Sequence, residues 1–177
     1  MKTTERFLIS AILLSLIAIP VPATTDLTVF GGAQNPGKIT LRSATGALAT
    51  TSPATFGTFG VRLALGTIVG SEHTFAYSPN FLTTQHSAII YNSNLLVQGP
   101  WFVRPYGTVG LGSVWVRGTG LQAVTGAKFA VNYGGGIKIR AIGPLGVQVD
   151  ARGYTLRGID QQTMNMLETS IGILFSF

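Results

Sequence analysis

The sequence predicts an all-β protein, an eight-stranded antiparallel up-and-down transmembrane β-barrel. First, hydrophobic and polar residues alternate along several segments, as in strands, whose side chains point to opposite faces in turn. Second, 46% of the residues are hydrophobic and only 10% are charged, whereas a soluble domain typically has about 25% charged residues. Third, no apolar run after residue 23 is long enough for a membrane helix, which needs about 20 residues.

The first 23 residues have the features of an export signal. Lys2 and Arg6 form a positive start, residues 7–19 contain no charge, and Pro20 is followed by Val-Pro-Ala, where cleavage is expected. We therefore expect a cleaved signal peptide, 1–23, and one barrel domain, 24–177, with an uncleaved membrane anchor as the alternative. The chain contains no cysteine, which excludes a lipoprotein anchor, a disulfide framework and a Cys-ligated metal.

Glycines and turn dipeptides divide the domain into eight predicted strands: 26–32, 55–69, 72–77, 87–97, 101–116, 128–140, 145–154 and 167–177. Polar stretches predict long loops at 33–54, 78–86, 117–127 and 155–166, and short turns are expected at 70–71, 99–100 and 143–144. Long and short connections therefore alternate. This is typical of membrane barrels with long external loops and short periplasmic turns, and an even strand count puts both ends of the domain on the periplasmic side.

The last strand shows the alternation most clearly. In LETSIGILFSF, Phe177, Phe175, Ile173 and Ile171 share one face, while the other face is mostly small or polar. About ten residues is also the length at which a tilted strand crosses a bilayer. A half-buried strand at the end of a soluble sandwich is the alternative for this segment alone.

From residue 55 onward, the odd-numbered positions are predicted to face lipid and the even-numbered positions to face the interior. The odd set is apolar, with Val61, Leu95, Ile137 and Val149 as examples, and the even set is polar, charged or glycine-rich. A narrow barrel needs small residues beside long ones inside. A soluble ligand-binding barrel would have the reverse polarity, so the pattern favours a membrane barrel.

The inward charges form a predicted lumen network: Arg62, Glu72, Arg104, Lys138, Arg140, Asp150, Arg152 and Glu168. A charge in a narrow lumen must be paired or hydrated. One interpretation is a salt-bridged plug, in which Arg104, Lys138 and Arg140 neutralise Glu72 and Asp150. The other is a narrow, weakly anion-favouring pore, because three acids face at least five bases.

The outward aromatic residues are predicted to form two belts at the membrane interfaces. Trp101, Phe175 and Phe177 are expected near the short turns, and Phe75, Tyr77, Tyr91, Trp115 and Tyr133 toward the long loops. High strand propensity of aromatic residues is the alternative explanation.

The sequence does not predict an enzyme. The two histidines are His73, expected to face outward, and His86, which lies at a loop edge with no carboxylate near it in sequence. A nucleophile, a base and an orienting acid would have to converge in space. Two histidines without cysteine also make a metal site unexpected, and we expect no cofactor. The basic residues are scattered rather than clustered, so no nucleic-acid partner is expected.

Four stretches, VRPYGTVGLGSVW (103–115), NYGGGIKIR (132–140), GVQVDARGY (146–154) and the terminal LETSIGILFSF, carry a resemblance. The chain resembles the eight-stranded outer-membrane barrels that include the OmpA transmembrane domain and the opacity-type porins. The resemblance implies an outer membrane of Gram-negative type, with its lipid and lipopolysaccharide as surroundings. It also implies that the barrel-assembly machinery reads Phe175 and Phe177 as a signal.

The expected role is structural or surface-interactive through external loops, whose ligand the sequence does not identify. A narrow porin for small solutes is the second expectation, and a lipid A-modifying barrel enzyme is the third.

Overall fold

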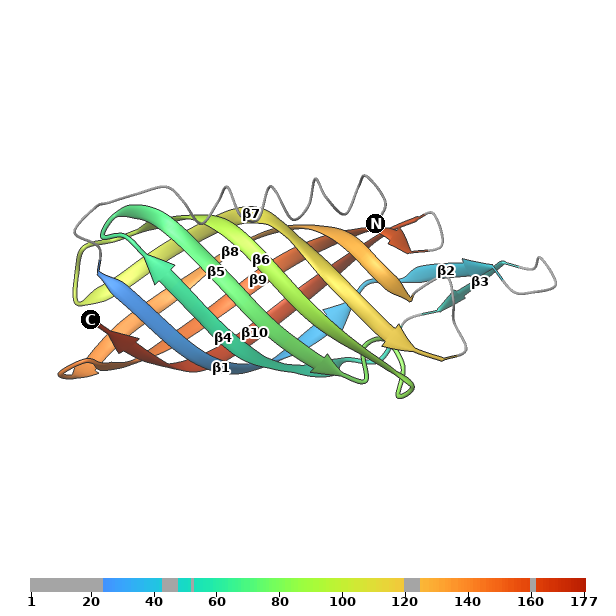
Figure 1. The fold of residues 1–177 in the computed structure, drawn as a ribbon, viewed down its shortest axis with the longest axis horizontal. Helices are drawn as coiled ribbons and strands as arrows, with labels where there is room; N and C mark the ends of the chain where they lie inside the picture. Colours follow the sequence, from blue (N-terminus) through green and yellow to red (C-terminus); the bar gives the residue numbers. More distant parts are fainter. Residues whose placement is uncertain (1–23, 43–47, 52, 120–124, 160–161) are drawn as a thin grey trace.

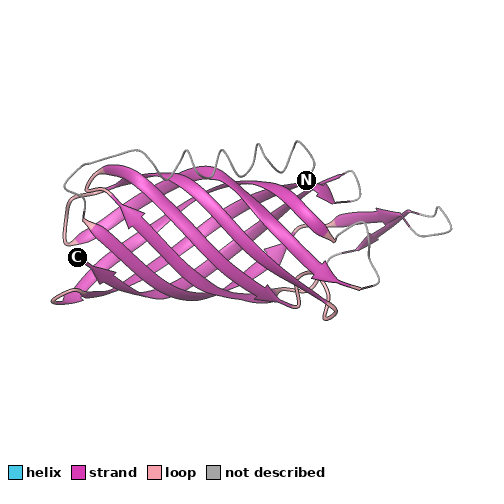
Figure 2. Cartoon of the chain, viewed as in Figure 1, coloured by secondary structure: helices cyan, strands magenta, loops and turns pink. Residues whose placement is uncertain are grey.

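The computed structural model of the chain describes residues 24–42, 48–51, 53–119, 125–159 and 162–177. The predicted signal peptide, 1–23, lies outside the described residues. All regular secondary structure in these ranges is β-strand (Figure 2). No helix within them has the length and apolarity to cross a membrane.

Eight antiparallel strands close into one barrel in the order β1-β10-β9-β8-β7-β6-β5-β4 (Figure 1). The ring closes at β1, where Val29 lies opposite Ile173 of β10 and Val61 of β4. Every barrel strand therefore has a hydrogen-bonded neighbour on both sides, which removes the exposed edge that an open sheet would have. The predicted fold class is confirmed.

The barrel strands are β1 (Thr25–Pro36), β4 (Phe56–Leu65), β5 (Val69–Pro79), β6 (His86–Gln98), β7 (Val103–Gly118), β8 (Gly126–Ile142), β9 (Leu145–Ile159) and β10 (Gln162–Ser176). A separate two-stranded ribbon of β2 (Ile39–Arg42) and β3 (Leu48–Thr51) connects β1 to β4 and projects beyond the barrel (Figure 1).

Both ends of the domain and three short turns lie at one end of the barrel, here called the turn end. Thr25 and Phe177 exchange two backbone hydrogen bonds with N–O distances of 3.2 and 2.8 Å. Residues 66–68, 99–102 and 143–144 join the strand pairs at this end. Gly143 has a φ of 57°, which glycine adopts without a Cβ penalty, so the two-residue turn between β8 and β9 forms easily. The opposite end is called the loop end.

Some predicted boundaries are wrong. The chain turns at 66–68 rather than at 70–71, because Gly66 takes a φ of 118° and β5 already begins at Val69. The stretch 155–166 is mostly strand, since β9 continues to Ile159 and β10 begins at Gln162. Part of 33–54 is likewise strand. Where paired strands extend beyond the apolar part of the barrel wall, their residues are polar, as loop residues are. Composition therefore did not distinguish strand from loop there.

Side chains alternate between the two faces of the barrel wall, with even-numbered residues inward and odd-numbered residues outward. Exposed large hydrophobic residues cover the outer face, among them Leu95, Val109, Ile137 and Ile171, each between 45% and 61% exposed. The same parity holds on β1, where Asp26 and Phe30 face inward. The outer face thus has the apolarity of a lipid-facing surface.

Candidate functional site

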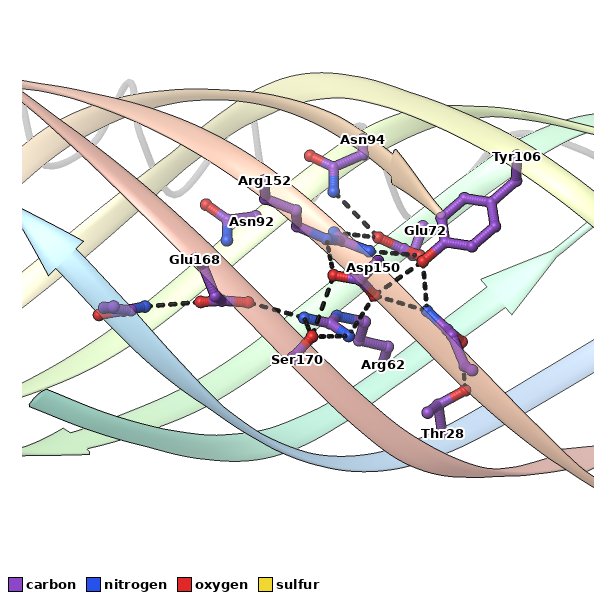
Figure 3. A network of polar contacts seen from close by, with 12 residues as sticks. Thr28, Arg62, Glu72, Asn92, Asn94, Tyr106, Asp150, Arg152, Glu168 and Ser170 are labelled. Atoms are coloured by element: carbon purple, nitrogen blue, oxygen red, sulfur yellow. Dashed lines mark hydrogen bonds and ion pairs between the residues drawn. The ribbon is translucent and has the colours of Figure 1, made fainter. Parts of the chain in front are cut away.

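The barrel interior is the candidate site, because it contains every carboxylate of the described residues. Asp26, Glu72, Asp150 and Glu168 are all buried, with at most 4% of each residue exposed. Figure 3 shows how side chains from opposite walls converge on the three carboxylates nearest the middle of the barrel. A buried carboxylate needs a cationic or hydrogen-bonding partner, and the structure supplies one to each.

Arg62 projects inward from β4 and connects the walls. Its two terminal nitrogens donate to Asp150 and to Glu168, each at 2.7 Å. Both nitrogens also lie 3.1 Å from the hydroxyl of Ser170. The guanidinium carbon stands 3.6 Å from the centre of the Phe30 ring, a cation–π contact on the remaining face. One arginine thus joins β4 to β9 and β10 across the lumen.

Asp150 of β9 is the most heavily bonded carboxylate of the network. Its five donors are Arg62 Nη1 at 2.7 Å, Tyr106 OH at 2.7 Å, Ser170 Oγ at 3.0 Å, Gln148 Nε2 at 3.1 Å and Arg152 Nε at 3.2 Å. Two of the donors are cationic, and charge-assisted hydrogen bonds are stronger than neutral ones. The carboxylate is therefore fixed from four strands: β4, β7, β9 and β10.

Arg152 and Glu72 form a two-point ion pair between β9 and β5. Arg152 Nη1 donates to Oε1 at 2.6 Å and Nη2 donates to Oε2 at 3.1 Å. Both side chains are fully buried. Asn94 Nδ2 donates to the same carboxylate at 3.2 Å. The parallel geometry matches the planar guanidinium to the carboxylate, which adds direction to the attraction.

A second cluster lies nearer the turn end, around Asp26. Lys138 Nζ and Arg104 Nη1 approach Asp26 Oδ2 at 3.0 and 3.1 Å, and the Ser176 hydroxyl donates to its other oxygen. Arg140 donates to Ser176 Oγ at 3.0 Å. Asp26 from β1 is thus held by residues of β7, β8 and β10 beside the end where the barrel closes.

The ion pairs differ from those expected from the sequence. Arg104 and Lys138 pair with Asp26, while Glu72 and Asp150 pair with Arg152 and Arg62. Arg140 is only half-buried and is bonded to a serine. Within the described residues, four buried cations face four buried carboxylates. The positive excess predicted for the lumen is therefore absent from its buried part, because Asp26 supplies the fourth acid.

The loop half of the interior is mainly apolar, although a polar branch enters it: Gln34 Nε2 donates to Glu168 at 2.6 Å, and the Ser78 hydroxyl donates to Gln34 Oε1 at 3.2 Å. Phe81, from the connection between β5 and β6, is fully buried and meets Phe56 at a centroid distance of 5.1 Å. Around this pair lies one cluster of inward-facing or capping side chains: Phe30, Phe56, Ala76, Phe81, Leu82, Ala88, Ile90, Val114, Val116, Ala130, Tyr154, Leu156, Met164 and Met166. The lumen therefore contains a charged layer near its middle and a mainly apolar layer toward the loop end.

The sequence reading missed this apolar layer and several polar partners. It assigned a polar character to the whole even-numbered face, although Ile90, Val114 and Leu156 are even-numbered and buried. It also began the parity at residue 55. Asp26 is even-numbered and lies opposite the even-numbered Ser176 of β10. Applying the same alternation to β1 would have identified Asp26 as an inward carboxylate. Nothing in the sequence marked Tyr106 and Gln148 as donors to Asp150.

The predicted aromatic belt residues lie mainly on the outer surface. Trp101, Phe75, Tyr77, Trp115, Tyr133 and Phe177 are exposed, and Phe175 is half-buried. Tyr91 differs, because it is buried at 4% exposure and its hydroxyl lies 3.1 Å from His73 Nδ1. Its neighbours on β5, His73 and Phe75, lie against its ring, so it packs between side chains rather than standing free.

The two histidines do not meet. His73 contacts Tyr91 on the outer face, whereas His86 Nδ1 lies 2.6 Å from the Thr83 hydroxyl at the loop end. Among the residues that the structure describes, no group of three or more His, Cys, Asp or Glu side chains could hold a metal ion.

No protein-family model matches the sequence, and no curated protein matches it. The fold is nevertheless similar to solved barrels. Neisserial surface protein A has a TM-score of 0.64 at 9% identity, covering 86% of this chain and 97% of that one. The N-terminal β-barrel domain of Pseudomonas aeruginosa OprF has a TM-score of 0.56 at 12% identity, covering 86% and 97%. The outer-membrane enzyme PagL has a TM-score of 0.50 at 13% identity, covering 85% and 98%. The chain has the fold of eight-stranded outer-membrane β-barrels.

Proposed function

We propose that the chain is an integral outer-membrane protein whose interior is a non-conducting plug and whose role is structural or surface-interactive at the loop end. The observation that carries this proposal is the polarity of the wall. Apolar side chains cover most of the outside, while all four side-chain carboxylates of the described residues lie inside, paired with buried cations. In water the apolar outer face would be exposed to solvent. In a bilayer that face contacts lipid, while the paired charges remain in the interior.

The series of two interior layers supports a closed lumen. An ion following the axis would first have to displace the network around Asp150 and Arg62. It would then have to cross the cluster around Phe81, Ile90 and Leu156, each fully buried. Apolar constrictions oppose ion passage because they offer nothing that replaces the hydration shell.

The first prediction is that the protein fractionates with the outer membrane and does not form a stable channel. We expect faster migration unboiled than boiled on a denaturing gel, and no sustained conductance steps in planar bilayers. Recovery in the soluble fraction would contradict the membrane assignment. Large, stable conductance would contradict the plug and support the narrow-porin alternative, without affecting the membrane assignment.

One observation favours that alternative. Asn132 is fully buried, yet neither its Oδ1 nor its Nδ2 has a hydrogen-bond partner among the described residues. The same is true of Thr74 Oγ1 and Thr108 Oγ1. Such groups are usually hydrated. A narrow water-filled passage beside the network would hydrate them, and the conductance measurement distinguishes it from isolated water.

The second prediction concerns assembly, on the proposal that the barrel-assembly machinery reads the terminal aromatic residue. Phe177→Ser should lower the amount of assembled barrel in cells more than Phe59→Ser does. Phe59 is an outward phenylalanine on β4. Phe177 is 73% exposed and Phe59 is 54% exposed, so lost packing alone predicts the opposite order. Refolding of the purified variants into detergent should be equally efficient. Equal assembly in cells would refute the proposed signal.

A third role, lipid modification, has weaker support, because His86 is bonded to Thr83 and no described carboxylate bonds to it. Mass spectrometry of lipid A from cells with and without the protein tests this role directly. A mass change that depends on His86 would establish it.

A further inference from the structure

A groove crosses the outer face of the barrel over β8, β9, β10 and β1. It consists of two adjoining depressions of about 630 and 540 Å³ that share Ala151. Its floor is a row of directly paired small residues, Ala33, Thr169, Ala151 and Gly135, one on each strand. Ile137, Val149 and Ile171 stand beside the row, so the floor lies below the surrounding aliphatic surface.

The chemistry of the groove changes toward the loop end. There Asn35 and Asn165 line it, and Gly37 donates its N–H to the Asn165 carbonyl at 2.7 Å. Beyond the groove lie two exposed cations, Arg157 on β9 and Lys38 directly after Gly37. The order along the surface is therefore small and aliphatic, then amide, then cationic.

No described carboxylate neutralises these cations on the outer surface, because all four lie in the interior. Their height is that of a membrane interface. Arg157 pairs with the outward Phe129, and Tyr133, 57% exposed, lines the same groove. Exposed aromatic residues mark the head-group level of a bilayer, so a phosphate at that level would meet Arg157.

We propose that the groove binds one phosphorylated glycolipid of the outer leaflet, with an acyl chain along the small-residue row and a phosphate at Arg157 and Lys38. The inference rests on the proposed outer-membrane location with the loop end outside. A second copy of the chain fits less well. A two-fold contact through this groove would place the same cations of both copies together, and like charges repel.

The test is native mass spectrometry of the detergent-refolded protein with bisphosphorylated lipid A as the probe. Gly31 lines the groove, and a Cβ built there meets no heavy atom within 4 Å. Gly31→Leu should therefore fold and fill the groove. Displacing roughly two methylenes of the acyl chain should weaken binding about tenfold. The control is Ser93→Leu on β6, an outward position opposite His73 of β5 and Leu111 of β7 and outside the groove, which should bind like wild type.

A second pair of variants tests the contribution of Arg157. Arg157→Gln should weaken lipid A binding about fivefold, the usual worth of one basic residue at a phosphate-bearing surface. Arg117→Gln, also exposed but on β7, should leave binding unchanged. Monophosphorylated lipid A should bind more weakly to wild type, and Arg157→Gln should reduce the difference between the two lipids, since Lys38 remains.

Equal binding by Gly31→Leu and Ser93→Leu, or by the two arginine variants, would overturn the lipid site. A wild-type dimer that only Gly31→Leu converts to a monomer would assign the groove to a second copy instead. Either result, combined with normal outer-membrane fractionation, rejects the groove proposal alone. Soluble fractionation would reject the proposed function itself.

Discussion

Arg152→Met is expected to lower the free energy of unfolding by about 3–5 kcal/mol, the usual cost of leaving one partner of a buried ion pair unpaired. Among the described residues, only the side-chain amide of Asn94, at 3.2 Å, would still donate to Glu72. Asp150 would lose one of its five donors as well. Methionine fills much of the arginine volume, so the charge rather than a cavity dominates the loss. Equilibrium urea titration of the refolded barrel measures the effect.

Two controls identify the origin of this loss. Adding Glu72→Leu to Arg152→Met removes the stranded charge, so the double variant should recover most of the lost stability. Arg117→Met makes the same chemical change at an exposed site and should stay within about 0.5 kcal/mol of wild type. A double variant that is less stable than Arg152→Met would contradict a dry, paired interior.

The sequence predicted the barrel well because its main signals are local. Period-two alternation, as in the strand that ends at Ser176, depends only on neighbouring residues and on which face lies in lipid. Glycine and proline located two of the three short turns for the same reason. The third, predicted at Gly70, moved to 66–68 because several glycines compete there, and only the register of β4 with β5 selects one of them.

The ion pairs could not be predicted in the same way. Arg62 and Asp150 are 88 residues apart, and their strands are separated by others around the ring. Which carboxylate a long side chain reaches depends on strand tilt and stagger around the closed barrel, and no sequence spacing encodes these. The alternation of even and odd residues assigned these charges to the inner face, but their pairing depends on the three-dimensional register.

Parity also says nothing about how the interior is divided along its axis. Arg152 and Leu156 both face inward from β9, four residues apart, yet one belongs to the charged network and the other to the apolar cluster. The strands are therefore joined across the lumen by ion pairs near the middle and by apolar packing toward the loop end.

Leu156→Ala is expected to lower the free energy of unfolding by about 2–5 kcal/mol, because it removes a fully buried side chain and leaves a cavity. Leu156 is 0% exposed inside the apolar layer, whereas Leu111, on the outer face of β7, is 56% exposed. Leu111→Ala loses roughly 2 kcal/mol of transfer free energy at most, since lipid can fill the space and no cavity forms. The comparison in one lipid or detergent thus isolates the cavity. If both variants lose the same stability, the loop half of the lumen is loosely packed or hydrated, and the barrier to conduction would have to lie in the charged layer alone.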